Sequence, residues 1–307
     1  MRVLIVGAAG FIGKAVADAL AEAGIESRLA DTRRRLERSD DWLPGRDVRE
    51  FDFSRQAASE ELLDGVDALV HLGCTTNPAR SMADMAFDAD SNIGPSIRLF
   101  ESAARAGIAR VIFASSGGTV YGVPECARVC EDAPTVPISA YGVSKLAVER
   151  YLAICPGVCG ISLRVANPYG AGQLRGSAVG VIARYLLAVS RGQPLEVWGT
   201  GSVIRDYIAI ADVAQAFLSA VVTRDIAPGP YNVGSGEGAS INEIISRIFA
   251  VSHRRVHVEY QEARGYDVPA IVLDSTRFRS QSGWHPRTGL DQGISELWSR
   301  ICAPATV

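Results

Sequence analysis

The chain has 307 residues, 48% of them hydrophobic, which is enough to bury the core of one large domain or of a domain with a smaller lobe. Its 31 basic and 34 acidic residues leave a net charge of only −3, so nothing in the charge points to nucleic acid or an acidic membrane surface. No apolar run approaches the roughly 18 residues of a membrane span, and the N-terminus has no signal-peptide pattern.

Cysteine usage agrees with a reducing compartment. None of the cysteines forms a C-x-x-C pair, and we expect free thiols without a disulfide framework or a metal site. The expected location is therefore the cytoplasm. The six cysteines are Cys74, Cys126, Cys130, Cys155, Cys159 and Cys302.

The N-terminal part alternates apolar strands with helices. "RVLIVGAAGFIGKAVADALAEAG" predicts a strand, a glycine loop and a helix that ends at Gly24. The same unit recurs through "ESRLAD", "VREFDF", a polar helix ending near Asp64, and "VDALVHLG". It continues through a helix over 81–106, "ARVIFASS", a helix over 139–154, and "GVCGISLRVAN". Such alternation favours a doubly wound α/β fold of the Rossmann type with a parallel sheet covered on both faces.

The character of the chain changes after Asn167. "PYGAGQLRGS" is typical of a loop, 177–191 of a helix, and "LEVWGTGSVIRDYIAIADVAQAF" of two strands that open a helix. "GPYNVGSGEGASINEIISRIF" predicts a strand, a turn and a helix capped by Ser240 with Glu243 three residues on. We expect a Rossmann domain over 1–167 and a smaller α/β substrate lobe over 168–307, with segments around 205–235 returning to the first domain. A ligand cleft would lie between them.

The glycine loop predicts a dinucleotide site. Gly7, Gly10 and Gly13 lie between strand and helix, where glycines let a pyrophosphate approach the backbone at the helix N-terminus. Asp31 closes the next strand, where its carboxylate can accept both ribose hydroxyls and repel a 2′-phosphate. This favours NAD over NADP, although Arg33 and Arg34 could hold that phosphate. Asp52 could meet the adenine amine or serve only as a loop carboxylate.

Several motifs together carry a family resemblance. They are "GAAGFIG", "HLGC", "SSGGTVYG", "YGVSK", "NPYGAGQ", "RDYIAIADVAQA", "YNVGSG" and "ARGYDV…GWHP". Over roughly 2–294 the chain resembles the extended short-chain dehydrogenase/reductase family, within its nucleotide-sugar epimerase and dehydratase branch, and is most similar there to UDP-hexose 4-epimerases. The resemblance adds further cofactor contacts, which are Phe11, Ile12, Phe53, Leu72, Gly73, Ser115, Tyr141 and Lys145.

Tyr141 and Lys145 are the expected catalytic pair. They lie four residues apart on one helix face, and an ammonium nearby should lower the pKa of the phenol toward neutrality. Such a phenol can take and return a hydroxyl proton while hydride moves to a nicotinamide. The resembling enzymes have a catalytic Ser or Thr at the position of Gly117. Thr119 is the expected replacement and Ser116 the second candidate.

The absence of acidic residues at positions 118 and 119 limits the reactions that this site can carry out. In the 4,6-dehydratases of the branch an Asp and a Glu occupy the positions of Gly118 and Thr119, and the decarboxylases also keep a Glu there. What remains here can oxidise C4 and reduce it again, which favours an NAD-dependent UDP-hexose 4-epimerase. A 4-ketosugar reductase using NAD(P) and a non-catalytic dinucleotide-sensing protein remain alternatives.

The resemblance also implies a substrate handle and an assembly. Asn167, Arg205 and Arg264 would hold the diphosphate, and guanidinium groups suit phosphate oxygens. Trp198 would lie beside the uracil or in the core, and Asp267 would hold a ribose hydroxyl. Ile271, at the position that limits bulk at C2, leaves the sugar open. A homodimer through the helices over 81–106 and 139–154 is expected.

Overall fold

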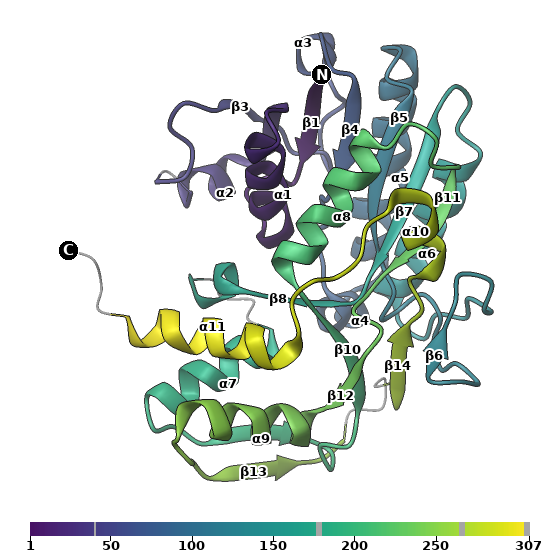
Figure 1. Cartoon of the computed structure of the whole chain (residues 1–307). Coiled ribbons are helices and arrows are strands. Elements are labelled where there is room, and N and C mark those ends of the chain that lie inside the picture. Colours follow the sequence, from purple (N-terminus) through teal and green to yellow (C-terminus); the bar gives the residue numbers. More distant parts are fainter. Residues whose placement is uncertain (40, 176–179, 264–267, 304–307) are drawn as a thin grey trace.

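A seven-stranded parallel sheet organises the molecule (Figure 1). The computed structural model describes residues 1–39, 41–175, 180–263 and 268–303. The strand order is β11-β7-β5-β4-β1-β2-β3, and every neighbouring pair is parallel. The strands are β1 (Arg2–Val6), β2 (Glu26–Asp31), β3 (Asp47–Glu50), β4 (Ala68–His71), β5 (Arg110–Ser116), β7 (Cys159–Val165) and β11 (Gly229–Val233).

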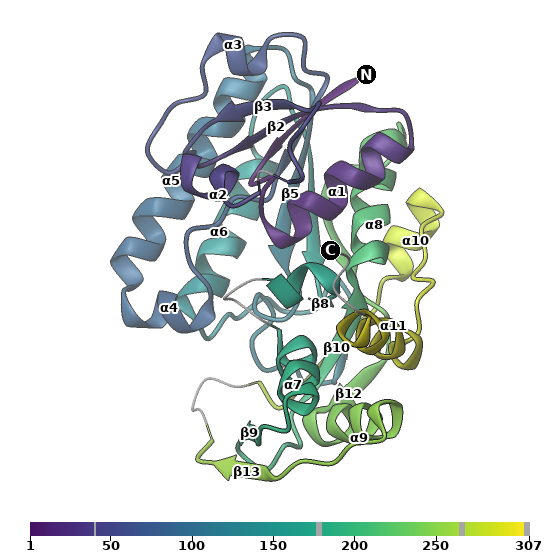
Figure 2. The ribbon, with the colours of Figure 1, turned by 90° about the vertical axis from the view of Figure 1, so that its left-hand side faces the viewer.

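Helices cover both faces of this sheet, which confirms the doubly wound fold. Figure 2 shows α5 (Met85–Arg105) and α6 (Ala140–Ala153) on one face and α1 (Phe11–Glu22) and α8 (Ile210–Val222) on the other. Central strands buried on both faces read as continuous apolar runs, as Val3–Val6 of β1 do. The short helices are α2 (Arg33–Glu37), α3 (Glu60–Leu63) and α4 (Pro78–Ala83).

A second group of elements lies beyond the carboxyl ends of the large sheet. Its five-stranded sheet has the order β12-β10-β14-β6, with β8 also paired to β10, and a separate pair joins β13 to β9. The strands are β6 (Arg128–Val129), β8 (Asn167–Tyr169), β9 (Leu195–Trp198), β10 (Ile204–Ala209), β12 (Gly238–Ser240), β13 (Val258–Gln261) and β14 (Ala270–Leu273). The helices are the 3₁₀ turn η1 (Ala171–Arg175), α7 (Val181–Ser190), α9 (Ile241–Ser252), α10 (Thr276–Ser282) and α11 (Leu290–Cys302).

Segments cross the predicted division at residue 167 in both directions. β11 extends the large sheet beside β7, and α8 packs against α1. In the other direction, β6 pairs with β14 in the smaller sheet. Strands from each half therefore complete the sheet of the other half. The boundary at residue 167 stays a prediction.

Three local predictions differ from the structure. The helix expected over 81–106 is two helices, because the Asp84 side chain accepts a hydrogen bond from the Phe87 amide (2.9 Å) and starts a new one. β3 ends at Glu50, before Asp52. The segment after Asn167 contains β8 and η1 instead of only a loop. The capping box at Ser240 and Glu243 is confirmed.

The sheet order places the ligand site. The chain leaves β1 for β2 on one side and reaches β4 on the other, so the strand order reverses between β1 and β4. Doubly wound sheets bind ligands at the carboxyl ends of the strands at such a point. The glycine loop follows β1 and the "HLGC" segment follows β4 at this point. Within the described ranges, no helix is long and apolar enough to cross a membrane.

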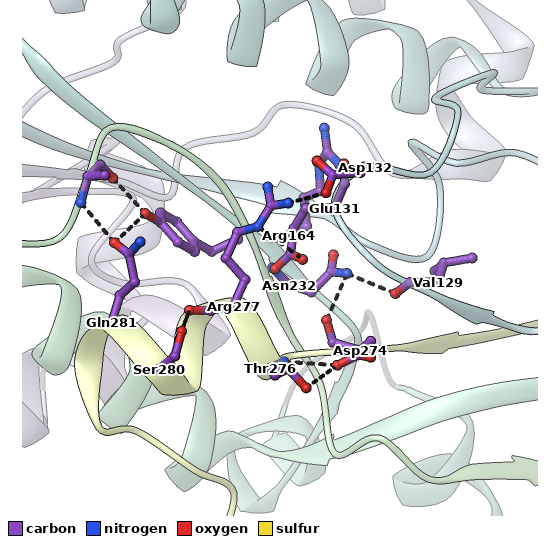
Figure 3. Close-up of polar contacts among 12 residues, drawn as sticks. Val129, Glu131, Asp132, Arg164, Asn232, Asp274, Thr276, Arg277, Ser280 and Gln281 are labelled. Carbon is purple, nitrogen blue, oxygen red and sulfur yellow. Dashed lines mark hydrogen bonds and ion pairs between the residues drawn. The ribbon is translucent and has the colours of Figure 1, made fainter.

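A polar cluster in the interior holds the two sheets together (Figure 3). The Asn232 amide donates to the carbonyls of Val129 (3.0 Å) and Asp274 (3.2 Å), so one side chain of β11 links β6 to the residue that follows β14. Arg277 pairs with Asp132 (2.5 Å). The bonds of Asn232 satisfy polar groups that burial would otherwise leave without partners, whereas Arg277 and Asp132 pair at the surface.

Candidate active site

The glycine loop after β1 has the shape of a phosphate cradle. Gly7 has φ +88°, and a Cβ there would lie 2.8 Å from the Gly73 amide nitrogen, so only glycine fits. Gly10 precedes α1 and Gly13 lies inside its first turn, and α1 has no side-chain cap and no acid in that turn. Its first N–H groups therefore fit an anion such as a pyrophosphate.

Asp31 at the end of β2 fastens this loop. It is 5% exposed and accepts hydrogen bonds from the amides of Ala9 (2.9 Å) and Thr32 (2.8 Å). Burial raises its pKa, and the nearby Arg35 guanidinium (4.0 Å) opposes that rise. Arg33 pairs instead with Glu37 (2.9 Å). Of the basic run, Arg35 is thus the residue that approaches Asp31.

The next expected cofactor contacts lie in the segments that follow β1, β3 and β4. The Asp52 carboxylate accepts from the Ser54 amide (3.0 Å) and hydroxyl (2.6 Å), which is a local turn contact. Phe53 is buried against His71, and Gly73 lies over the Phe53 ring, where a Cβ would be 2.6 Å from it. The remaining contacts flank the loop and the end of β4, and they are Phe11, Ile12 and Leu72.

Tyr141 and Lys145 lie on the first turns of α6, beside the loop after β5. Ser139 caps the helix, and the Tyr141 amide donates to the Ser81 hydroxyl of α4 (3.0 Å). A Cβ on Gly142 would lie 2.6 Å from the Thr119 carbonyl, so glycine lets the helix start touch the 116–119 turn. Lys145 is buried, donates to the Ala114 carbonyl (2.8 Å), and lies 5.5 Å from the Tyr141 ring centroid.

The expected lowering of the Tyr141 pKa is not what the chain alone produces. Burial raises the pKa of this phenol well above its usual value, and the charges of Cys74 and Asp88 add to the rise. The Lys145 ammonium donates a hydrogen bond to the Ala114 carbonyl (2.8 Å). The prediction from the helix spacing was therefore wrong in sign for the protein by itself, because desolvation outweighs the neighbouring ammonium.

Gly117 does not remove a hydroxyl from the site. A Cβ at this position would point into the protein, 2.3 Å from Leu273 Cδ1 and 3.0 Å from the Arg164 carbonyl. At Gly118 the nearest atom would be the Asn167 side-chain oxygen, 3.8 Å away. The backbone after β5 thus turns position 117 toward β14 and position 118 toward the open side.

The candidate hydroxyls differ in what surrounds them. The Ser115 hydroxyl donates to Glu149 on the buried side of β5. The Thr119 oxygen is closed off from solvent without a hydrogen-bond partner among the described residues. Ser116 is half-buried, and its hydroxyl is not one of those closed-off oxygens. Without rotation of its side chain Thr119 cannot reach a sugar, so the geometry favours Ser116, the reverse of the order expected from the sequence.

We expect Ser116→Ala to lower kcat by roughly 10², the usual effect of losing one positioned donor. Thr119→Val removes only an unpartnered hydroxyl at nearly constant volume, so its kcat should stay within about threefold and its stability should not fall. Steady-state kinetics and urea denaturation of both variants measure this. A Thr119→Val enzyme that is slower than Ser116→Ala would restore the original order.

One cavity connects these groups to the smaller lobe. It has a volume of about 650 Å³ and is walled by Ser116, Thr119, Tyr141, Asn167 and Arg205 among others. No carboxylate lies in its described wall, and Arg205 is the cation there. Hydroxyls and a phenol suit the hydroxyl groups of an uncharged sugar ring, and the guanidinium suits an anionic group attached to that ring.

The expected substrate residues are only partly brought together. Asn167 and Arg205 line the cavity. The Asn167 amide donates to the Asp206 carbonyl (3.3 Å) and the Arg205 guanidinium to the Val268 carbonyl. Trp198 ends β9 and is 39% exposed, so it is not a core aromatic, and it does not line this cavity. Ile271 is buried in β14. The expected residues Arg264 and Asp267 lie outside the described residues.

The sequence did not reveal the polar residues that lie behind Tyr141 and Lys145. Asp88 and Asn92 of α5 and Ser144 of α6 form hydrogen bonds next to Tyr141 and Lys145. The only local signal was Ser144 inside "YGVSK". Within the described ranges, no group of three or more acidic, His or Cys side chains is arranged to hold a metal ion.

The doubly wound sheet with a glycine loop after β1 is the fold of a dinucleotide-binding protein, and Tyr141 and Lys145 lie beside the loop after β5. The profile of the NAD dependent epimerase/dehydratase family matches residues 3–234, and the chain belongs to that family.

Full-length relatives carry two different activities. The chain is 32% identical to a UDP-glucose 4-epimerase of Mycolicibacterium smegmatis, over 96% of this chain and 97% of that one. It is also 32% identical to a dTDP-4-dehydro-6-deoxyglucose reductase of Escherichia coli, over 97% of each. The solved Thermus thermophilus UDP-glucose 4-epimerase in complex with NAD is 28% identical, with a TM-score of 0.87 and full coverage of both chains.

Proposed function

We propose that the protein is an NAD-dependent 4-epimerase of a nucleotide sugar, with UDP-hexoses as the favoured substrates. The observation that carries this is the cavity wall, which combines Tyr141 and Ser116 with no carboxylate in its described part. Elimination of water from a sugar needs a further acid and base, whereas epimerisation needs one proton shuttle. The epimerase relatives support the same reaction.

The residues of the chain divide the chemistry between them. Tyr141 takes the proton of the C4 hydroxyl while the C4 hydride leaves, and it returns the proton when hydride comes back to the opposite face of the 4-keto sugar. Ser116 donates a hydrogen bond to the C4 oxygen, with Thr119 as the second candidate. Lys145 orients the phenol and would hold the nicotinamide ribose. The proton and the hydride each return, so the sum is an inversion.

Several residues would hold the NAD. The loop of Gly7, Gly10 and Gly13 would bind the pyrophosphate and Asp31 the adenosine ribose. The expected flanking contacts are Phe11, Ile12, Asp52, Phe53, Leu72, Gly73 and Ser115, the last through its backbone because its hydroxyl bonds Glu149. NAD supplies the hydride acceptor and donor, and its oxidised form carries a positive charge. That charge would offset the burial that raises the pKa of Tyr141.

The substrate would enter with its diphosphate toward the smaller lobe. Asn167 and Arg205 are the described groups for it, and a guanidinium can bind two phosphate oxygens at once. Arg264 for the diphosphate, Asp267 for a ribose hydroxyl and Trp198 for the uracil remain parts of the proposal. The choice of UDP is supported by the relatives with UDP-glucose 4-epimerase activity.

A 4-ketosugar reductase is the second candidate, because a reductase is as similar in sequence as an epimerase. The two differ in what happens to the cofactor. The purified protein, given a UDP-sugar and no added NAD, should form the C4 epimer in large excess over enzyme. A reductase would stop after at most one turnover. Mass spectrometry of the co-purified dinucleotide accompanies this test, and a panel of UDP-, GDP-, CDP- and dTDP-sugars identifies the base.

We further infer a homodimer built on α5 and α6. These helices pack against each other and leave Met85, Phe87, Val143 and Tyr151 exposed. Sedimentation equilibrium should therefore give twice the 32.7 kDa of one chain. A cytoplasmic location is also part of the proposal, and it is supported by the six cysteines being free.

A further inference from the structure

A small polar cavity lies behind the catalytic pair, separate from the large one. Its volume is about 10 Å³, and Asp88, Asn92, Ser144, Tyr141 and Lys145 are among the residues that line it. Among the described residues of this wall, Asp88 is the only one with a carboxylate. It is 1% exposed and takes no part in the chemistry proposed above.

Asp88 ties three segments together. One carboxylate oxygen accepts from the Ser144 hydroxyl of α6 (2.6 Å). The other accepts from the Thr76 hydroxyl, in the segment after β4, and from the Asn92 amide (3.3 Å). Ser144 stands three residues after Tyr141 and directly before Lys145. The position of both side chains therefore depends on a bond that Asp88 of α5 accepts from Ser144 of α6.

The partners of Asp88 are all neutral groups. Two hydroxyls and an amide stabilise a carboxylate by hydrogen bonding but cancel none of its charge. Charge at Asp88 is accordingly felt by its neighbours, and it is one of the causes that raise the pKa of Tyr141. Asp88 does not line the substrate cavity. Asp88 acts on the sugar only indirectly, and Tyr141 is the residue that lines both cavities.

We propose that Asp88 is a positioning residue for the reaction, which fixes α6 through Ser144 and places a fixed negative charge behind the Tyr141–Lys145 pair. The inference rests on the proposed function, because it takes Tyr141 as the group that exchanges the substrate proton. The positive charges of bound NAD and of Lys145 would lower the basicity of the phenolate, and the negative charge of Asp88 would restore part of it. The same residue would also hold the helix that carries both groups.

Other titratable groups face this region from each packed element. α6 contributes Tyr141 and Lys145, and the segment after β4 contributes Cys74. His71 of β4 bonds Ser96 (2.9 Å), and burial together with Lys145 lowers its pKa to about 3, so it is neutral. Substitution of Asp88 by an amide thus changes one charge in a region whose other groups stay in place.

The test is Asp88→Asn, which keeps the shape and an oxygen that can accept from Ser144. Loss of the negative charge lowers the pKa of Tyr141, so the acid limb of kcat should move to lower pH by roughly one unit, the size of a neighbouring-charge effect. KM for UDP-glucose should stay within about twofold, because Asp88 is outside the substrate cavity. The measurement is the pH profile of kcat, with NAD content and a thermal melt as folding controls.

Ser144→Ala is the matched variant, since it removes the bond to α6 but keeps the charge. Its kcat should fall about fivefold or more with KM unchanged and no shift of the limb to lower pH, and Ser144→Thr should restore it. If Asp88→Asn folds and the acid limb of its kcat profile does not shift, the proposed effect of the Asp88 charge on Tyr141 is wrong. If Ser144→Ala has an unchanged kcat, the proposal that Asp88 positions α6 through Ser144 is wrong. The Ser144→Ala experiment decides this even if Asp88→Asn does not fold. A wild-type protein inactive on every nucleotide sugar would instead sink the proposed function.

Discussion

Tyr141→Phe should lower kcat for 4-epimerisation by about 10³, within the range for loss of a positioned acid–base group. The variant keeps the ring that Lys145 faces and removes only the oxygen that carries the proton. NAD content and KM should change by less than about threefold, since the phenol oxygen is needed for proton transfer more than for binding. Conversion of UDP-glucose in a coupled assay, with the dinucleotide measured by mass spectrometry, checks this.

Tyr151→Phe provides a matched control for that substitution. It makes the same change ten residues later on the same helix, at a side chain that is 46% exposed and outside both cavities. Its activity should equal that of the wild type. If Tyr141→Phe also retained full activity, the reading of the chain as a non-catalytic dinucleotide-sensing protein would become the better one.

The parts of the site that the sequence predicts well are local. The glycines of the loop lie within seven residues of one another and are fixed by a strand and a helix that each have a clear apolar pattern. Tyr141 and Lys145 share a face because any helix gives residues four apart that relation. Ser240 caps its helix, as its position three residues before Glu243 indicates.

The parts that it misses depend on contacts across long separations. A Cβ at position 117 would meet Leu273 of β14, a contact that no residue near 117 in the sequence indicates. The pKa of Tyr141 depends on burial by several segments and on Asp88 of α5, and no spacing within α6 contains that information. The choice between Ser116 and Thr119 likewise depends on which oxygen the packed turn leaves open. A motif fixes which groups are present, but tertiary packing decides which of them can react.

Arg164→Leu should lower the free energy of unfolding by about 3–5 kcal/mol, the cost of leaving one charge of a buried pair alone. Arg164 of β7 is 1% exposed and pairs with Glu149 of α6 at 2.7 Å, and it also donates to the Tyr121 hydroxyl at 3.0 Å. Burial by itself would lower the pKa of Arg164, but the Glu149 carboxylate raises it above its usual value. Urea denaturation measures the loss. Arg150 is an exposed residue of α6, next to Glu149, and Arg150→Ala should change the free energy of unfolding little.

The double variant Arg164→Leu, Glu149→Leu distinguishes the net contribution of the ion pair from the cost of leaving one of its charges buried and unpaired. Removing both charges leaves no uncompensated carboxylate, so much of the loss seen in Arg164→Leu should be recovered. Glu149 also accepts from the Ser115 hydroxyl, next to Ser116 in the cavity wall. We therefore expect the stabilised double variant to show a lower kcat, because the end of β5 loses its anchor. A double variant no more stable than Arg164→Leu would mean that packing around Arg164, and not its charge, holds α6 to the sheet.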